Sequence, residues 1–94
     1  MNIGLMTLEL FLPASSSLKD KRKVIQSLQH RLRNRFNVSV AEVGRQELWQ
    51  RASIAVVSVG SRRELLDQIF DSIVAEAEKS VPGEVLGAER EYFG

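Results

Sequence analysis

The sequence of 94 residues contains no cysteine, one histidine and six scattered glycines. It can therefore form no disulfide bond, thiolate nucleophile or cysteine-based metal site, and it lacks both metal-ligand spacing and a glycine-rich phosphate loop. No apolar run approaches the roughly 20 residues that span a bilayer, and the N-terminus has no signal-peptide pattern. We expect a cytoplasmic protein with no membrane segment, no metal and no cofactor.

Charge of neither sign dominates, because 13 Lys and Arg stand against 12 Asp and Glu for a formal net charge of +1. This balance excludes a uniformly basic nucleic-acid protein and an acidic disordered tail. The distribution is uneven, however. Residues 18–36 carry seven Lys or Arg and one Asp, a net charge of +6. Residues 64–94 carry two Lys or Arg and eight Asp or Glu, a net charge of −6. The length allows one domain, residues 1–94.

Hydrophobic periodicity predicts four strands and two helices. The strands are expected over residues 2–12, 37–43, 52–59 and 84–93. A first helix runs to about Arg35 behind a capping-box spacing of Ser17 with Asp20, and a second follows a capping-box spacing of Ser61 with Glu64. Their apolar stripes are Leu18, Ile25, Leu28, Leu32 and Phe36 in the first helix, and Leu65, Leu66, Ile69, Phe70, Ile73, Val74 and Ala77 in the second.

The predicted order is βαββαβ, in which the first and third strands are the most continuously apolar and belong at the centre of a sheet. Right-handed crossovers then favour a four-stranded antiparallel sheet in the order 4-1-3-2, with both helices on one face. This α+β arrangement is the ferredoxin-like fold.

Catalysis has little support in these residues. The single histidine, His30, falls on the polar side of the first helix, where a solvated side chain is favoured over a general base. Acylphosphatases share the predicted fold and carry an arginine in the turn after the first strand, but residues 13–17 contain none. We therefore expect a protein that is not an enzyme.

The strongest polar feature is the first helix. Lys19, Arg22, Lys23, Gln26, His30 and Arg33 form one stripe opposite the apolar face, flanked by Arg31 and Arg35. Such charge gains by displacing counterions from RNA phosphates, although a solvated helix face is an equally good interpretation. A phosphate could also bind at the helix start, near Ser15–Ser17, Lys19, Lys21 and Arg22, but capping by the serines is favoured there.

The third feature surrounds the entry to the strand over 52–59. Trp49 and Arg51 are expected on one side of that strand, as Glu9 and Phe11 are on the first strand. If that side lacks helices, Trp49 and Phe11 could stack bases. Dimer contact is favoured over stacking, because the same face would expose a large apolar patch. That patch comprises Ile3, Leu5, Phe11, Ala55, Val57 and Val59.

Three blocks, Ser17 to Arg22, Arg31 to Val43 and Leu48 to Ala52, resemble the YlxP family of small bacterial proteins over nearly the whole chain. Gly44-Arg45 departs from the family pattern, in which many members carry an acidic or polar residue before Gln46. The resemblance implies a ferredoxin-like fold with no established catalytic residues. Its genes often neighbour those of translation initiation and ribosome maturation factors, which implies a ribosome-linked role.

Three hypotheses follow. The first is a non-enzymatic cytoplasmic module that binds structured RNA, for example ribosomal RNA, with Trp49 and Arg51 as weaker contacts. The second is a homodimeric protein-interaction module that uses the apolar sheet face around Phe11, and the third is a small-ligand sensor by fold analogy. In the first hypothesis the phosphates are contacted by Lys19, Lys21, Arg22, Lys23, Arg31, Arg33 and Arg35.

Overall fold

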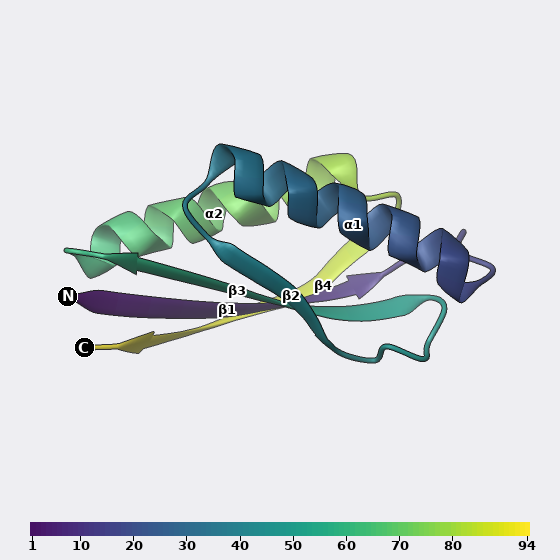
Figure 1. Cartoon of the computed structure of the whole chain (residues 1–94), viewed down its shortest axis with the longest axis horizontal. Coiled ribbons are helices and arrows are strands. Elements are labelled where there is room, and N and C mark those ends of the chain that lie inside the picture. The colour runs from purple at the N-terminus through teal and green to yellow at the C-terminus, as the bar shows by residue number, and fades with distance from the viewer.

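The structure, a computed structural model, describes all of residues 1–94 and places two helices on one face of a four-stranded sheet (Figure 1). The order of the elements is the predicted βαββαβ. In chain order they are β1 (Asn2–Phe11), α1 (Leu18–Arg35), β2 (Ser39–Gly44), β3 (Arg51–Gly60), α2 (Arg63–Ser80) and β4 (Glu84–Phe93).

The strands lie in the order β2-β3-β1-β4, and each neighbouring pair is antiparallel. This is the predicted order read from the opposite edge, so the ferredoxin-like fold is confirmed. The register of β1 and β3 runs unbroken from Asn2 opposite Gly60 to Phe11 opposite Arg51. Because Ile3 pairs with Phe93, the two chain ends lie side by side at one end of the sheet (Figure 1).

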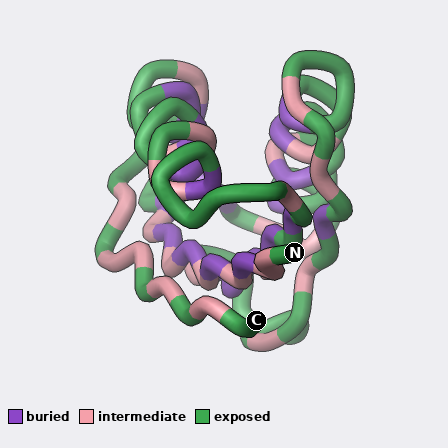
Figure 2. The backbone as a smooth tube through the Cα atoms, turned by 90° about the vertical axis from the view of Figure 1, so that its left-hand side faces the viewer, coloured by how far each residue is buried: buried purple, intermediate pink, exposed green.

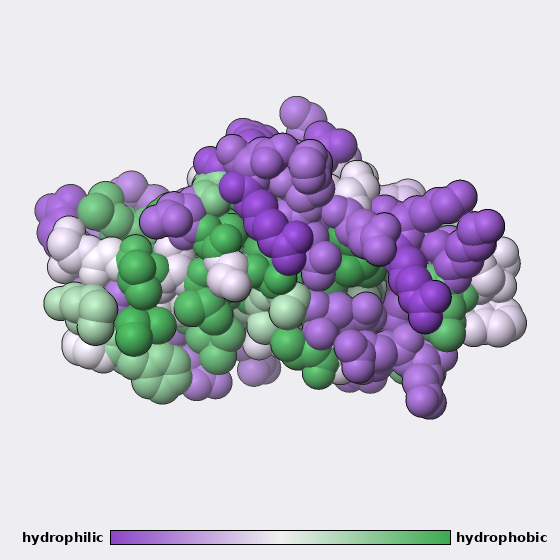
Figure 3. Space-filling model, viewed as in Figure 1, coloured by the Kyte–Doolittle hydropathy of each residue, from purple (hydrophilic) through white to green (hydrophobic).

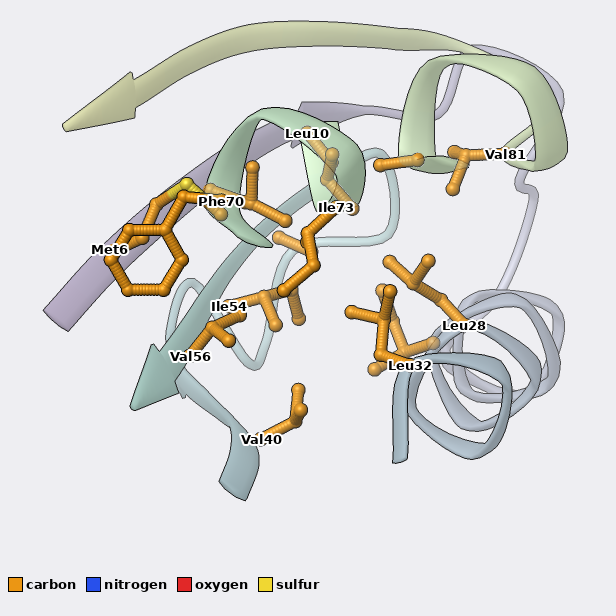
Figure 4. Close-up of a cluster of buried hydrophobic side chains, with 14 of the residues drawn as sticks. Met6, Leu10, Leu28, Leu32, Val40, Ile54, Val56, Phe70, Ile73 and Val81 are labelled. Atoms are coloured by element: carbon orange, nitrogen blue, oxygen red, sulfur yellow. The ribbon is translucent and has the colours of Figure 1, made fainter. Parts of the chain in front are cut away.

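The core lies between the sheet and the helices, which stand side by side above it in Figure 2. Strand alternation produces this layer, because Met6, Leu8 and Leu10 of β1 point to the helices and are buried, while their neighbours in β1 point away. Figure 4 shows side chains from both helices and the sheet meeting there. The helices supply Ile25, Leu28, Leu32, Phe70, Ile73 and Ala77 to this core.

The two helices begin differently. Ser17 caps α1 as predicted, since its Oγ accepts a hydrogen bond from the Asp20 backbone N–H at 3.0 Å. The predicted cap of α2 by Ser61 is wrong, because the extended cap residue is Arg62, whose side chain makes no capping bond. An acidic residue in the first turn, Glu64, still suits the positive end of the helix dipole.

Candidate nucleic-acid interface

The predicted polar stripe of α1 faces solvent, and all six of its residues, from Lys19 to Arg33, are exposed. Three of its cations, Lys19, Arg22 and Lys23, form no ion pair with any carboxylate of the chain. They lie in the first two turns of the helix. The N-terminal half of α1 therefore presents three exposed cations against one exposed acid, Asp20, which leaves it with net positive charge.

Lys21 does not belong to this surface, so its prediction as a phosphate contact is wrong. Its side chain is 1% exposed, and its Nζ lies 2.9 Å from Glu42 Oε2 of β2. The same ammonium donates hydrogen bonds to the carbonyl oxygens of Arg45, Gln46 and Arg51. Helical spacing indicates this burial, because Lys21 precedes the buried Ile25, Leu28 and Leu32 by four, seven and eleven residues and so lies on the same face of α1.

The C-terminal half of α1 holds its arginines against other parts of the fold. Arg31 and Arg35 flank Glu76 of α2, with nitrogen–oxygen distances of 3.6 and 2.7 Å. Arg33 donates a hydrogen bond to the carbonyl of Val40 at 2.8 Å. These three side chains keep exposed surface, but Glu76, a buried acid that the sequence reasoning missed, offsets part of their charge.

The serines before α1 form hydrogen bonds within the chain. Ser15 is buried and donates to the carbonyl of Ser17, while the Asp20 carboxylate accepts hydrogen bonds from the Ser16 Oγ at 2.8 Å and N–H at 3.2 Å. The Ser16 hydroxyl holds the pKa of Asp20 below its usual range. Because Ser16 donates both its N–H and its hydroxyl to Asp20, it has no donor left for a phosphate. This arrangement favours capping over a phosphate site among the serines.

Trp49 was predicted on strand β3, and that placement is wrong. It lies in the six-residue loop 45–50 and is 55% exposed. The assigned ladder ends at Phe11 and Arg51, and one more bond in the same register follows, from the Leu12 N–H to the Gln50 carbonyl at 2.8 Å. Gln50 Nε2 also donates to the Pro13 carbonyl at 3.1 Å. Trp49 comes after this last bond, so it belongs to the loop and not to a face of the sheet.

Phe11 and Arg51 do lie opposite each other on the helix-free face, and the predicted apolar patch lies on the same face. Ile3, Leu5, Val57 and Val59 occupy its end nearest the chain termini, with Phe93 of β4 beside Ile3. Figure 3 shows hydrophobic residues gathered along the sheet layer in the left half of the view, below the hydrophilic helices. The other end of this face is polar, with Glu9 paired to Arg45 at 3.3 Å and accepting from the Ser53 hydroxyl.

Neither helix is long and apolar enough to cross a membrane. No group of three or more His, Asp or Glu side chains is placed to hold a metal ion. His30 is exposed, and its Nε2 lies 3.0 Å from Asn34 Nδ2.

Comparisons with known proteins agree with the fold and name a family. A family model described as "Protein of unknown function (DUF503)" matches residues 3–90. The uncharacterized protein YlxP of Bacillus subtilis (strain 168) is 36% identical over 73 residues, which cover 78% of this chain and 79% of that protein. A solved structure, the de novo designed protein Ferredog-Diesel, is similar with a TM-score of 0.52 at 13% identity, covering 95% of this chain and 83% of that one. At that identity the designed protein supports the fold alone.

Proposed function

The chain belongs to the DUF503 family of proteins of unknown function, and we propose that it is a non-enzymatic cytoplasmic module that binds the phosphate backbone of structured RNA, for example ribosomal RNA. The observation that carries this proposal is the exposed, unpaired set Lys19, Arg22 and Lys23 at the start of α1. Cations of this kind release condensed counterions when they contact phosphates.

Helix stability gives a poor account of the same charges. The N-terminus of a helix carries a partial positive charge, so a lysine in its first turn, such as Lys19, lowers helix stability by roughly 0.3–1 kcal/mol. The first turn of each helix contains one acid, Asp20 in α1 and Glu64 in α2. The helices differ in their second turns, where α1 adds the exposed bases Arg22 and Lys23 and α2 adds the acid Asp67. Phosphate contact is a reason to keep these bases in α1.

Binding of a labelled RNA stem-loop, measured by fluorescence anisotropy across a salt series, tests this proposal. We expect the logarithm of the association constant to fall linearly with the logarithm of salt concentration. Each phosphate contact contributes about 0.7–0.9 to that slope, so the double variant Arg22→Gln/Lys23→Gln lowers it by about 1.5.

A matched control is Arg62→Gln/Lys79→Gln, which removes two exposed charges at the ends of α2. It changes the net charge equally and should leave the slope nearly unchanged. Equal effects of the two double variants would mean that binding follows net charge alone, and the assignment to α1 would then be wrong. Salt-independent binding, or none, would refute the RNA proposal itself.

A second candidate function is self-association through the helix-free face, and the apolar end of that face favours it. Val59 and Phe93 there are 53% and 51% exposed. Three strands of ten residues, with one shorter edge strand, span a face of about 33 by 19 Å, or about 600 Å². The apolar end is about half of this face, well below the roughly 800 Å² that each partner buries in a stable complex, so we expect a weak dimer.

The proposed occupant is a second copy of this chain. A two-fold axis parallel to the strands places β1 of one copy over β3 of the other, so that Ile3 and Leu5 meet Val59 and Val57. We expect sedimentation equilibrium to detect a dimer that Val59→Lys dissociates. Leu65→Lys, an exposed apolar position on α2, serves as the control. A wild-type chain that stays monomeric at every concentration would exclude this candidate.

A further inference from the structure

Loop 45–50, which carries Trp49, lies against the first turns of α1, which carry the exposed cations. Both therefore lie at the same end of the molecule. The buried ammonium of Lys21 joins them, because it binds the carbonyl oxygens of Arg45, Gln46 and Arg51. Trp49 is two residues from Arg51, so its Cα lies within about 7.6 Å of the Arg51 Cα. The neighbours of Lys21 on α1, Arg22 among them, are the exposed cations described above.

The loop is held at several points. Besides the two bonds from Lys21 to the carbonyls of Arg45 and Gln46, Gln50 binds segment 12–15 through its backbone carbonyl and its side chain. The Leu48 N–H donates to the Arg45 carbonyl at 3.0 Å, which closes a turn. The backbone that carries the Trp49 indole is therefore fixed before any ligand binds. This lowers the conformational entropy that the loop loses on binding.

The indole of Trp49 is open to a partner. Residues 47–51 border a shallow, open depression beside it. The Nε of the neighbouring Arg51 is buried, so a ligand at this place cannot reach it. Glu47 is the only acid in the loop, and it disfavours a phosphate over the loop itself. A flat, uncharged group that stacks on the indole suits this place better.

We propose that Trp49 stacks on an unpaired base of the RNA whose phosphates contact Lys19 and Arg22, so that the ligand is an RNA helix interrupted by a bulge rather than a continuous duplex. This inference rests on the proposed RNA binding. In this arrangement α1 contacts the phosphates of the RNA backbone, and the loop binds one unstacked base through the indole ring of Trp49.

The experiment compares a blunt RNA duplex with the same duplex carrying one bulged nucleotide, under identical salt. Because Trp49 is the only tryptophan, its intrinsic fluorescence reports on this residue alone. The wild-type chain should bind the bulged duplex roughly tenfold more tightly, the size expected for one stacked base. Only the bulged duplex should quench the fluorescence.

Trp49→Ala should bind both duplexes with the affinity that the wild type has for the blunt one. Leu48→Ala, which removes a neighbouring exposed side chain of the same loop, should keep the tenfold preference. Both positions are exposed, so neither change threatens folding.

If the wild type binds both duplexes equally, or if Trp49→Ala retains the preference, the stacking inference is overturned while salt-dependent duplex binding keeps the proposed function. If neither duplex binds at any salt concentration, the proposed function fails and the stacking inference fails with it. Quenching by the bulged duplex that disappears in Arg22→Gln/Lys23→Gln would support both, because it links the stacked base to the phosphates held by α1.

Discussion

Replacing Lys21 by methionine removes the ammonium group that joins α1, β2 and loop 45–50. Methionine keeps the length and apolar stem of the side chain, so the change isolates the charge and its donors. The ion pair with Glu42 at 2.9 Å and the hydrogen bonds to the carbonyls of Arg45, Gln46 and Arg51 are lost together. The Glu42 carboxylate and three carbonyl groups then have no cation to bind.

The expected decrease in the free energy of unfolding follows from the burial of this ion pair. Removing one partner of a buried ion pair costs about 3–5 kcal/mol, because an uncompensated charge stays inside the protein. Glu42 keeps 18% of its side chain exposed, so water can reach it and the lower end of that range applies, about 3 kcal/mol. This is a large fraction of the roughly 5–15 kcal/mol that stabilises a domain.

Urea unfolding followed by circular dichroism measures the effect. With a slope of about 1.5 kcal/mol per molar urea, the midpoint of Lys21→Met should lie roughly 2 M below that of the wild type. Lys19→Met and Lys23→Met, which change exposed lysines, should stay within about 0.5 kcal/mol. The double variant Lys21→Met/Glu42→Gln should recover part of the loss, because it also removes the unpaired acid.

A Lys21→Met variant as stable as Lys19→Met would refute this reasoning. It would mean that the ammonium contributes no more than a surface charge and that the four oxygen partners are satisfied by water. A double variant less stable than Lys21→Met alone would also contradict it, since Glu42 would then stabilise the fold without its partner.

Three further predictions concern other contacts. Gly4→Ala should cost about 1–3 kcal/mol in chemical denaturation, because a Cβ there would lie 2.8 Å from the buried Phe70 ring; an unchanged midpoint would contradict the packing. The pKa of Asp20 lies below its ordinary value of 3.8, so this carboxylate stabilises the fold above that pH and loses its contribution as the pH falls through the lowered pKa. Ser16→Ala should raise this pKa in an NMR titration, and an unmoved value would show that the hydroxyl is not its cause. Glu76→Gln should strengthen salt-dependent RNA binding several-fold by freeing two arginines of α1, whereas weaker binding would argue that Glu76 positions them.

Much of the fold was predictable because its signals are local. Strand β1 alternates inward and outward residues, and the apolar stripe of α1 repeats every three to four positions, so both elements follow from neighbours in the sequence. Boundaries were less predictable. The cap of α2 falls on Arg62 instead of Ser61, a shift of one residue that the capping pattern does not resolve.

The candidate interface was only partly predictable, for a related reason. A helical wheel separates the exposed Lys19 and Arg22 from the apolar face, but it does not say which buried position accepts a charge. Lys21 is tolerated inside because Glu42 and the loop carbonyls, more than twenty residues away, surround it. Trp49 was placed on a strand because the sequence does not state where the β-ladder ends.

The sequence by itself determined the βαββαβ order, the faces of the elements and the concentration of positive charge in α1, since these depend on residues a few positions apart. The tertiary structure alone decided which cations remain free. It buries Lys21 against Glu42, sets Arg31 and Arg35 against Glu76, and leaves Lys19, Arg22 and Lys23 at the start of α1 without an ion-pair partner. Charges are neutralised by whatever lies within a few ångströms, and those neighbours come from distant parts of the chain.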